Sequence, residues 1–190
     1  MAYDLKNVFY LDTSAFITAA TTGDGTAQLD LSAYIDPIAR GRTKGTGLAI
    51  YRTHFNVSGA SAPGTAPSDK PVDPAETGVM SYGLIAGLGA GDNATGAVGL
   101  GSSAFLNTNN LLVSAAQYYA PGATANMNGQ YMTVEASDEV PYVIVRDNVC
   151  LAYSIRDNFA DGATISVRLE CAQITLDQAT LNQLLRTQTV

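Results

Sequence analysis

Residues 142–176 read YVIVRDNVCLAYSIRDNFADGATISVRLECAQITL, and they carry the clearest structural pattern of the chain. Tyr142–Arg146 and Val149–Ile155 are short runs rich in β-branched and aromatic residues, which are typical of strands. Asp147-Asn148 lies between them and favours a tight turn, because both side chains can hydrogen-bond to nearby backbone. This part of the chain therefore predicts a strand, a turn and a second strand.

The second half of this stretch predicts a longer strand followed by a helix. From Thr164 to Cys171 apolar and polar residues alternate, as in a strand with one buried face. After Cys171 the apolar series moves by one residue, which indicates a β-bulge. A helix is expected from about Asp177 to Arg186, capped by Thr175 or Asp177. Its narrow apolar stripe consists of Leu181, Leu184 and Leu185.

Further strands are expected nearer the N-terminus. Residues 15–20 and 26–31 are β-prone runs joined by Gly23-Asp24-Gly25, which predicts a hairpin. Gly47–Val57 alternates cleanly, so its residues divide into two faces. One face holds Ala49, Tyr51, Thr53, Phe55 and Val57, and the other holds Leu48, Ile50, Arg52, His54 and Asn56. The second face begins apolar and ends polar, as expected of a strand that leaves a core for its rim.

Two segments between the strands lack a regular pattern. Residues 58–79 predict a long irregular loop, because they include four prolines and proline cannot donate to a strand ladder. Residues 83–101 are rich in Gly and Ala, and within them Gly89–Ala94 loosely fits a dinucleotide fingerprint. The Gly-rich sequence that follows is a poor helix former, so we expect no cofactor there. Strand patterns return at 111–118 and 131–135.

The whole pattern predicts an all-β protein. Nine or ten short strands joined by Gly, Asn, Asp and Pro turns are typical of an antiparallel β-sandwich, here with one short C-terminal helix. The length of 190 residues suits a single domain, 1–190, because sandwiches often reach this size without splitting.

The charge of the chain argues against direct binding of nucleic acid. The formal net charge is −7 and only 14% of the residues are charged, whereas binding to phosphates needs clustered Lys and Arg. The densest basic stretch, Arg40, Arg42 and Lys44, reads as a solvated turn. The N-terminal residues lack the basic and apolar regions of an export signal, so we expect synthesis in a cytosol.

The residues most able to carry chemistry are few and scattered. His54 is the single histidine, and without a neighbouring Cys, Asp or Glu in the sequence it reads as a surface or hydrogen-bonded residue. Cys150 and Cys171 both lie in expected strands, which favours buried free thiols over a bridge.

The carboxylates also suggest structural roles. Asp157–Gly162 could gather oxygen ligands for calcium, but its spacing misses the usual loop and favours a plain turn. Asp138 and Glu139 are adjacent and would point to opposite faces of an extended chain, which argues against shared acid–base work. We therefore expect no catalytic residue, no cofactor site and no metal site, and no enzymatic activity.

The layout of Thr26–Ile35, Gly47–Val57 and Tyr142–Leu176 resembles the single jelly-roll capsid proteins of tailless icosahedral viruses. This resemblance implies a sandwich of two four-stranded sheets whose long loops contact neighbouring subunits. It also implies a virion structural protein that self-assembles into a capsid shell, in the host cytoplasm, with copies of itself and other shell proteins as partners. The chain departs from many small-virus coat proteins because it lacks an arginine-rich N-terminal arm. That departure suits a shell built over an internal membrane or a separate inner layer.

Two other classes of protein fit the same pattern. One is a carbohydrate-binding or adhesive β-sandwich, in which some of the ten tyrosines stack on sugars and loop aspartates hold calcium. The other is a phage tail, fibre or decoration protein, which shares the β-rich and Gly-rich composition. A three-fold assembly would favour the second class, and a glycan ligand would favour the first.

Overall fold

The computed structural model describes seven ranges of the chain: 8–36, 44–59, 78–86, 111–119, 131–135, 141–155 and 159–187. Within these ranges it contains nine strands and one helix. They are β1 (Val8–Ile17), β2 (Gly23–Asp30), β3 (Lys44–Gly59), β4 (Gly78–Ala86), β5 (Leu111–Tyr119), β6 (Tyr131–Glu135), β7 (Tyr142–Ile144), β8 (Asn148–Ile155), β9 (Ala163–Asp177) and α3 (Gln178–Thr187). The predictions of strands at 111–118, 131–135 and 164–176 and of a C-terminal helix are confirmed.

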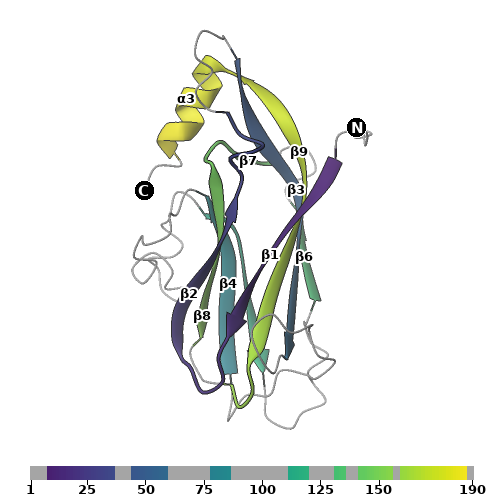
Figure 1. Cartoon of the computed structure of the whole chain (residues 1–190), viewed down its shortest axis with the longest axis vertical. Helices are drawn as coiled ribbons and strands as arrows, with labels where there is room; N and C mark the ends of the chain where they lie inside the picture. Colours follow the sequence, from purple (N-terminus) through teal and green to yellow (C-terminus); the bar gives the residue numbers. More distant parts are fainter. Residues whose placement is uncertain are drawn as a thin grey trace.

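The strands form two antiparallel sheets that pack face to face. The first sheet has the order β1-β9-β3-β6, and the second has the order β2-β8-β4-β5. Figure 1 shows these two layers, with α3 at one end of the sandwich. The first sheet has five strands rather than the four that the resemblance implied, because the 16-residue β3 pairs with both β6 and β7 along one edge.

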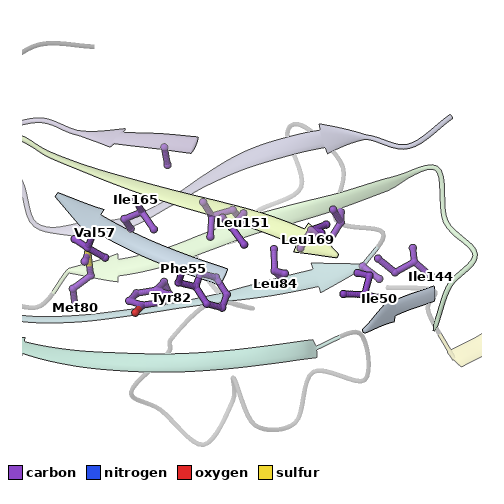
Figure 2. Packing of buried hydrophobic residues seen from close by; sticks show 14 of the residues in the cluster. Ile50, Phe55, Val57, Met80, Tyr82, Leu84, Ile144, Leu151, Ile165 and Leu169 are labelled. Atoms are coloured by element: carbon purple, nitrogen blue, oxygen red, sulfur yellow. The ribbon is translucent and has the colours of Figure 1, made fainter. Parts of the chain in front are cut away.

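The core lies between the two layers. Phe55 of β3 and Tyr82 of β4 meet near its middle, with ring centroids 4.9 Å apart and both side chains fully buried (Figure 2). Leu84, Leu151 and Ile165 pack around them. Alternation places these residues inward because successive side chains of a strand point to opposite faces of its sheet. These residues belong to one hydrophobic cluster within the described part of the chain.

The predicted hairpin between 15–20 and 26–31 is wrong. β1 ends at Ile17 and pairs with β9, whereas β2 begins at Gly23 and pairs with β8 in the other sheet. The turn between them is held by a left-handed backbone conformation at Ala20 and by a hydrogen bond to Phe159. Ala20 has a φ of 57°, and its N–H donates to the carbonyl of Phe159 at 2.8 Å. The connection, residues 18–22, therefore crosses between the layers, and the Gly23-Asp24-Gly25 expected in the turn begins β2 instead.

The phase change in β9 does correspond to a register irregularity, but the extra residue lies in the neighbouring strand. Ile50 pairs with Cys171 and Arg52 pairs with Glu170, which leaves Tyr51 of β3 as the additional residue. The irregularity also corrects the expected faces of Gly47–Val57. Leu48 and Ile50 share the core with Phe55 and Val57, although strict alternation along the strand would place these two pairs on opposite faces. Arg52, His54 and Asn56 lie on the outer face.

The two irregular segments are shorter than expected. Residues 58–59 end β3 and residues 78–79 begin β4, so the loop predicted at 58–79 includes strand at both of its ends. Gly83–Ala86 completes β4 and is buried, which corrects the start of the Gly- and Ala-rich segment predicted at 83–101. The reason is that Leu84 and Ile85 are large apolar residues, and β4 buries them between its two neighbouring strands. Residues 60–77 and 87–101 of the two predicted segments lie outside the described residues.

The C-terminal helix is capped by Asp177 rather than Thr175. The Asp177 Oδ1 atom accepts a hydrogen bond from the backbone N–H of Thr180 at 2.7 Å, and Leu181 is buried below. This hydrogen bond holds the pKa of Asp177 below its ordinary value, with smaller contributions that include the Thr180 side chain and Lys44. In the described part of the chain no helix is long and apolar enough to cross a membrane.

We predict that this cap makes stability depend on pH in the acid range. Because the pKa of Asp177 is lowered by folding, its contribution is complete above the unfolded value and is lost as the pH falls through the folded value. Asp177→Asn keeps a capping oxygen but does not titrate. Urea unfolding between about pH 5 and pH 2 should therefore show a steeper loss for the natural chain than for the variant. The prediction would be contradicted if the free energy of unfolding fell equally with pH in the natural chain and in Asp177→Asn.

Candidate functional site

The outer face of the first sheet carries a groove of about 510 Å³, here called the outer groove. Its residues come from three neighbouring strands, β1, β9 and β3. They are Tyr10, Asp12, Thr13, Ser14, His54, Asn56, Ser166, Val167, Arg168 and Glu170. In each of these strands every second side chain points into the core, and the side chains between them point outward. Most residues of the outer groove are these outward-pointing polar side chains.

Strand register arranges the polar residues of the outer groove in rows across the sheet. In one row Asp12 of β1 lies opposite Arg168 of β9, which lies opposite His54 of β3. In the next row Ser14 lies opposite Ser166, and Ser166 lies opposite Asn56. The two rows place charged residues beside neutral donors and acceptors. Directly opposite residues on one face are close enough to act on the same bound molecule.

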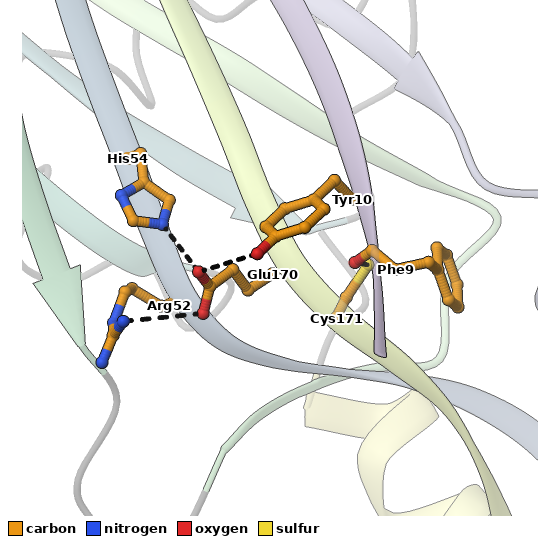
Figure 3. A network of polar contacts seen from close by, with 6 residues as sticks. All are labelled: Phe9, Tyr10, Arg52, His54, Glu170 and Cys171. Carbon is orange, nitrogen blue, oxygen red and sulfur yellow. Dashed lines mark hydrogen bonds and ion pairs between the residues drawn. The ribbon is translucent and has the colours of Figure 1, made fainter. Parts of the chain in front are cut away.

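Glu170 organises one end of the outer groove. Its Oε1 atom accepts a hydrogen bond from the Tyr10 hydroxyl at 3.4 Å and lies 3.1 Å from Nε2 of His54. Its Oε2 atom lies 3.8 Å from Nη1 of Arg52 (Figure 3). One carboxylate therefore joins side chains from all three strands. The His54 and Glu170 side chains are only 17% and 21% exposed, so these contacts are partly shielded from water.

His54 is a hydrogen-bonded residue, as the sequence predicted. Its carboxylate partner was missed, because Glu170 lies 116 positions further along the chain. The sequence does show that His54 and Glu170 each lie on the polar face of an alternating strand. Only the pairing of β3 with β9 brings these two faces together.

Arg168 and Asp12 lie in the middle of the outer groove and are both exposed. The Arg168 guanidinium lies 6.0 Å from the centroid of the Tyr10 ring, which is its one contact of this kind within the described ranges. Among those same residues, the side chains of Arg168 and Asp12 make no hydrogen bond or ion pair with protein groups. The guanidinium donors and the carboxylate are therefore open to solvent and to a bound molecule.

The two thiols are free and buried, which confirms the preference for free cysteines over a bridge. Cys150 lies in β8 and Cys171 in β9, in different sheets. Burial raises the pKa of Cys171 to about 12, and its Sγ–H donates to the carbonyl of Phe9 at 3.5 Å. Burial also raises the pKa of Cys150. Since the thiolate is the nucleophile, these two thiols are poorly suited to nucleophilic chemistry.

The other residues singled out in the sequence do not join the outer groove. Lys44 begins β3 and is exposed, and Asp161 is exposed in the turn before β9. Arg40, Arg42, Gly89–Ala94, Asp138, Glu139 and residues 157–158 lie outside the described residues. Within the described residues no three His, Cys, Asp or Glu side chains are grouped so as to hold a metal ion.

Comparison with known proteins identifies the fold. No family model and no curated protein sequence matches the chain. Among solved structures, VP1 of Merkel cell polyomavirus in complex with disialyllactose superposes with a TM-score of 0.50 and 6% sequence identity. The alignment covers 93% of this chain and 98% of that one.

The fold is a jelly roll. Two further jelly-roll structures align less closely. VP1 of human polyomavirus 12 in complex with 3'-sialyllactosamine has a TM-score of 0.46 and 11% identity, and the alignment covers 89% of this chain and 100% of that one. Tomato aspermy virus has a TM-score of 0.41 and 17% identity, with 87% of this chain and 78% of that chain covered. The expected antiparallel, jelly-roll-like sandwich with one C-terminal helix is confirmed.

Proposed function

We propose that this jelly roll is a virion structural protein that self-assembles into an icosahedral capsid shell. The observation that carries the proposal is the likeness to Merkel cell polyomavirus VP1, a capsid protein, over nearly the whole of both chains. At 6% identity that likeness concerns the fold, so the function is our inference from it.

The architecture of the chain supports this role. In the described part of the chain Phe55, Tyr82 and Leu151 are fully buried between the sheets. Symmetric assembly of such a subunit can repeat one modest contact many times. The described thiols are buried, and the polar groups lie mainly on the outer surface, as a structural subunit requires.

We infer that the partners are copies of this chain and other shell proteins, and that the protein resides in the virion after assembly in the host cytoplasm. The net charge of −7 supports a shell that does not itself bind the genome, because cationic clusters supply most of the affinity for phosphates. An internal membrane or a separate inner layer would then lie beneath the shell. We also infer a structural rather than a catalytic role.

The test is the assembly state of the full chain. We expect particles, or capsomers with five- or six-fold symmetry, when protein concentration and ionic strength are varied in mass photometry and negative-stain microscopy. The same protein should be a stoichiometric component of particles isolated from its native source. A monomer under all conditions, together with absence from particles, would refute the proposal. Three-fold assemblies would instead favour a tail, fibre or decoration protein.

A further inference from the structure

We propose that the outer groove is a binding site for a neutral, polyhydroxylated ligand, that is, an uncharged sugar. This inference rests on the groove alone and goes beyond the proposed shell function. Its volume of about 510 Å³ lies within the range of small-molecule sites, which is about 300–1,000 Å³.

The first argument is the unused hydrogen-bonding capacity at the centre of the groove. Asp12 and Arg168 are directly opposite each other on adjacent strands, and in the described part of the chain neither side chain makes a hydrogen bond or ion pair. A carboxylate only accepts and a guanidinium only donates. Neighbouring hydroxyls of a sugar can do both, so one can donate to Asp12 while the other accepts from Arg168. This complementarity selects a ligand rich in hydroxyl groups.

The second argument is the aromatic side chain at the edge of the same groove. Tyr10 is 58% exposed, and it is the one large exposed hydrophobic residue of the described ranges. Its hydroxyl donates to Glu170 Oε1 at 3.4 Å, which directs the tip of the ring toward the groove (Figure 3). An exposed, oriented ring offers a flat apolar surface for the C–H face of a sugar ring.

The third argument concerns charge. The carboxylates of Asp12 and Glu170 balance the guanidinium groups of Arg168 and Arg52 at this face. Asn56, Ser14 and Ser166 add neutral donors and acceptors in the neighbouring row. An anionic ligand would be attracted to Arg168 but would also meet the Asp12 carboxylate opposite it. The balance therefore favours an uncharged ligand over a sialylated, sulfated or phosphorylated one.

The experiment uses the full chain and defined probes. Lactose, maltose, cellobiose and N-acetylglucosamine serve as neutral probes, and 3'-sialyllactose serves as the acidic one. Binding is followed by saturation-transfer NMR and by calorimetry. We expect at least one neutral probe to bind, and Asp12→Asn or Arg168→Gln to weaken that binding about tenfold or more, since each removes a charge-assisted hydrogen bond. Tyr10→Leu should also weaken that binding, because it removes the exposed ring on which the sugar would pack.

Matched controls separate the groove from the rest of the surface. Asp161→Asn and Arg186→Gln make the same chemical changes at exposed positions outside the groove and should leave binding unchanged. Unfolding midpoints of all variants establish that they are folded. The proposal is overturned if no neutral probe binds the folded protein, if binding survives in both groove variants, or if 3'-sialyllactose binds more tightly than lactose. None of these outcomes bears on assembly, which is measured separately by particle formation.

Discussion

Replacing Phe55 by alanine is expected to lower the free energy of unfolding by about 3–5 kcal/mol. Phe55 is completely buried between the sheets, where its ring packs against that of Tyr82. The loss combines the lost transfer of the ring from water with the cavity that remains, because strands on both sides are held by their ladders and relax only partly. Urea unfolding followed by circular dichroism measures the change.

The control for this prediction is Tyr82→Phe. In the described part of the structure the Tyr82 hydroxyl is buried without a hydrogen-bond partner, and burial raises the pKa of this group. Removing an unsatisfied buried hydroxyl should leave stability unchanged or increase it. A large loss in Phe55→Ala beside no loss in Tyr82→Phe would show that ring packing, rather than the polar atom, stabilises this part of the core. A loss below about 1 kcal/mol in Phe55→Ala would contradict the prediction.

Replacing Glu170 by alanine is expected to cost about 1–3 kcal/mol of stability, although the residue lies on the outer face. The change removes the acceptor shared by the Tyr10 hydroxyl and the His54 ring, and the cost falls mainly on His54, because its side chain is 17% exposed whereas Tyr10 can bond to water. Arg52 contributes less, because its side chain is 41% exposed and its contact of 3.8 Å is long. Chemical unfolding gives the loss, and the NMR signals of the Tyr10 ring report whether its orientation is lost.

Glu170→Gln is the matched variant. The amide keeps an oxygen acceptor for Tyr10 or His54 but loses the charge, so its stability should fall between those of the natural protein and Glu170→Ala. If the alanine variant were as stable as the natural chain, the three contacts of Glu170 would have no net stabilising effect. If both variants lost the same amount, charge rather than the acceptor atom would account for the stabilisation.

The local elements were predictable because their signals are local. The strand at 131–135 matches β6 residue for residue, and Thr164–Leu176 lies within β9. In both cases the alternation of side chains is enough to identify the strand. Asp177 was one of two candidate caps for the same reason, since the capping hydrogen bond spans three residues.

The pairing of elements was much less predictable. Gly23-Asp24-Gly25 has the composition of a hairpin turn, but it begins β2, and composition does not reveal that this strand pairs in the other sheet. The face of Leu48 and Ile50 was misassigned because the extra residue Tyr51 changes the phase of β3. The outer groove escaped prediction altogether, since it needs residues of three strands whose neighbours are set by the topology.

The position of β9 between β1 and β3 has a consequence for the order of folding. Tyr10 and Glu170 are neighbours in space but are 160 residues apart in sequence. During synthesis on the ribosome, β1 has no partner strand until residues 163–177 have emerged, and β3 lacks its longest pairing until the same moment. Non-local pairing of this kind makes folding slow, in the range of milliseconds to seconds. On the nascent chain β3 can therefore pair with β6 and β7 first, and the first sheet is completed only when β9 joins β1 to β3.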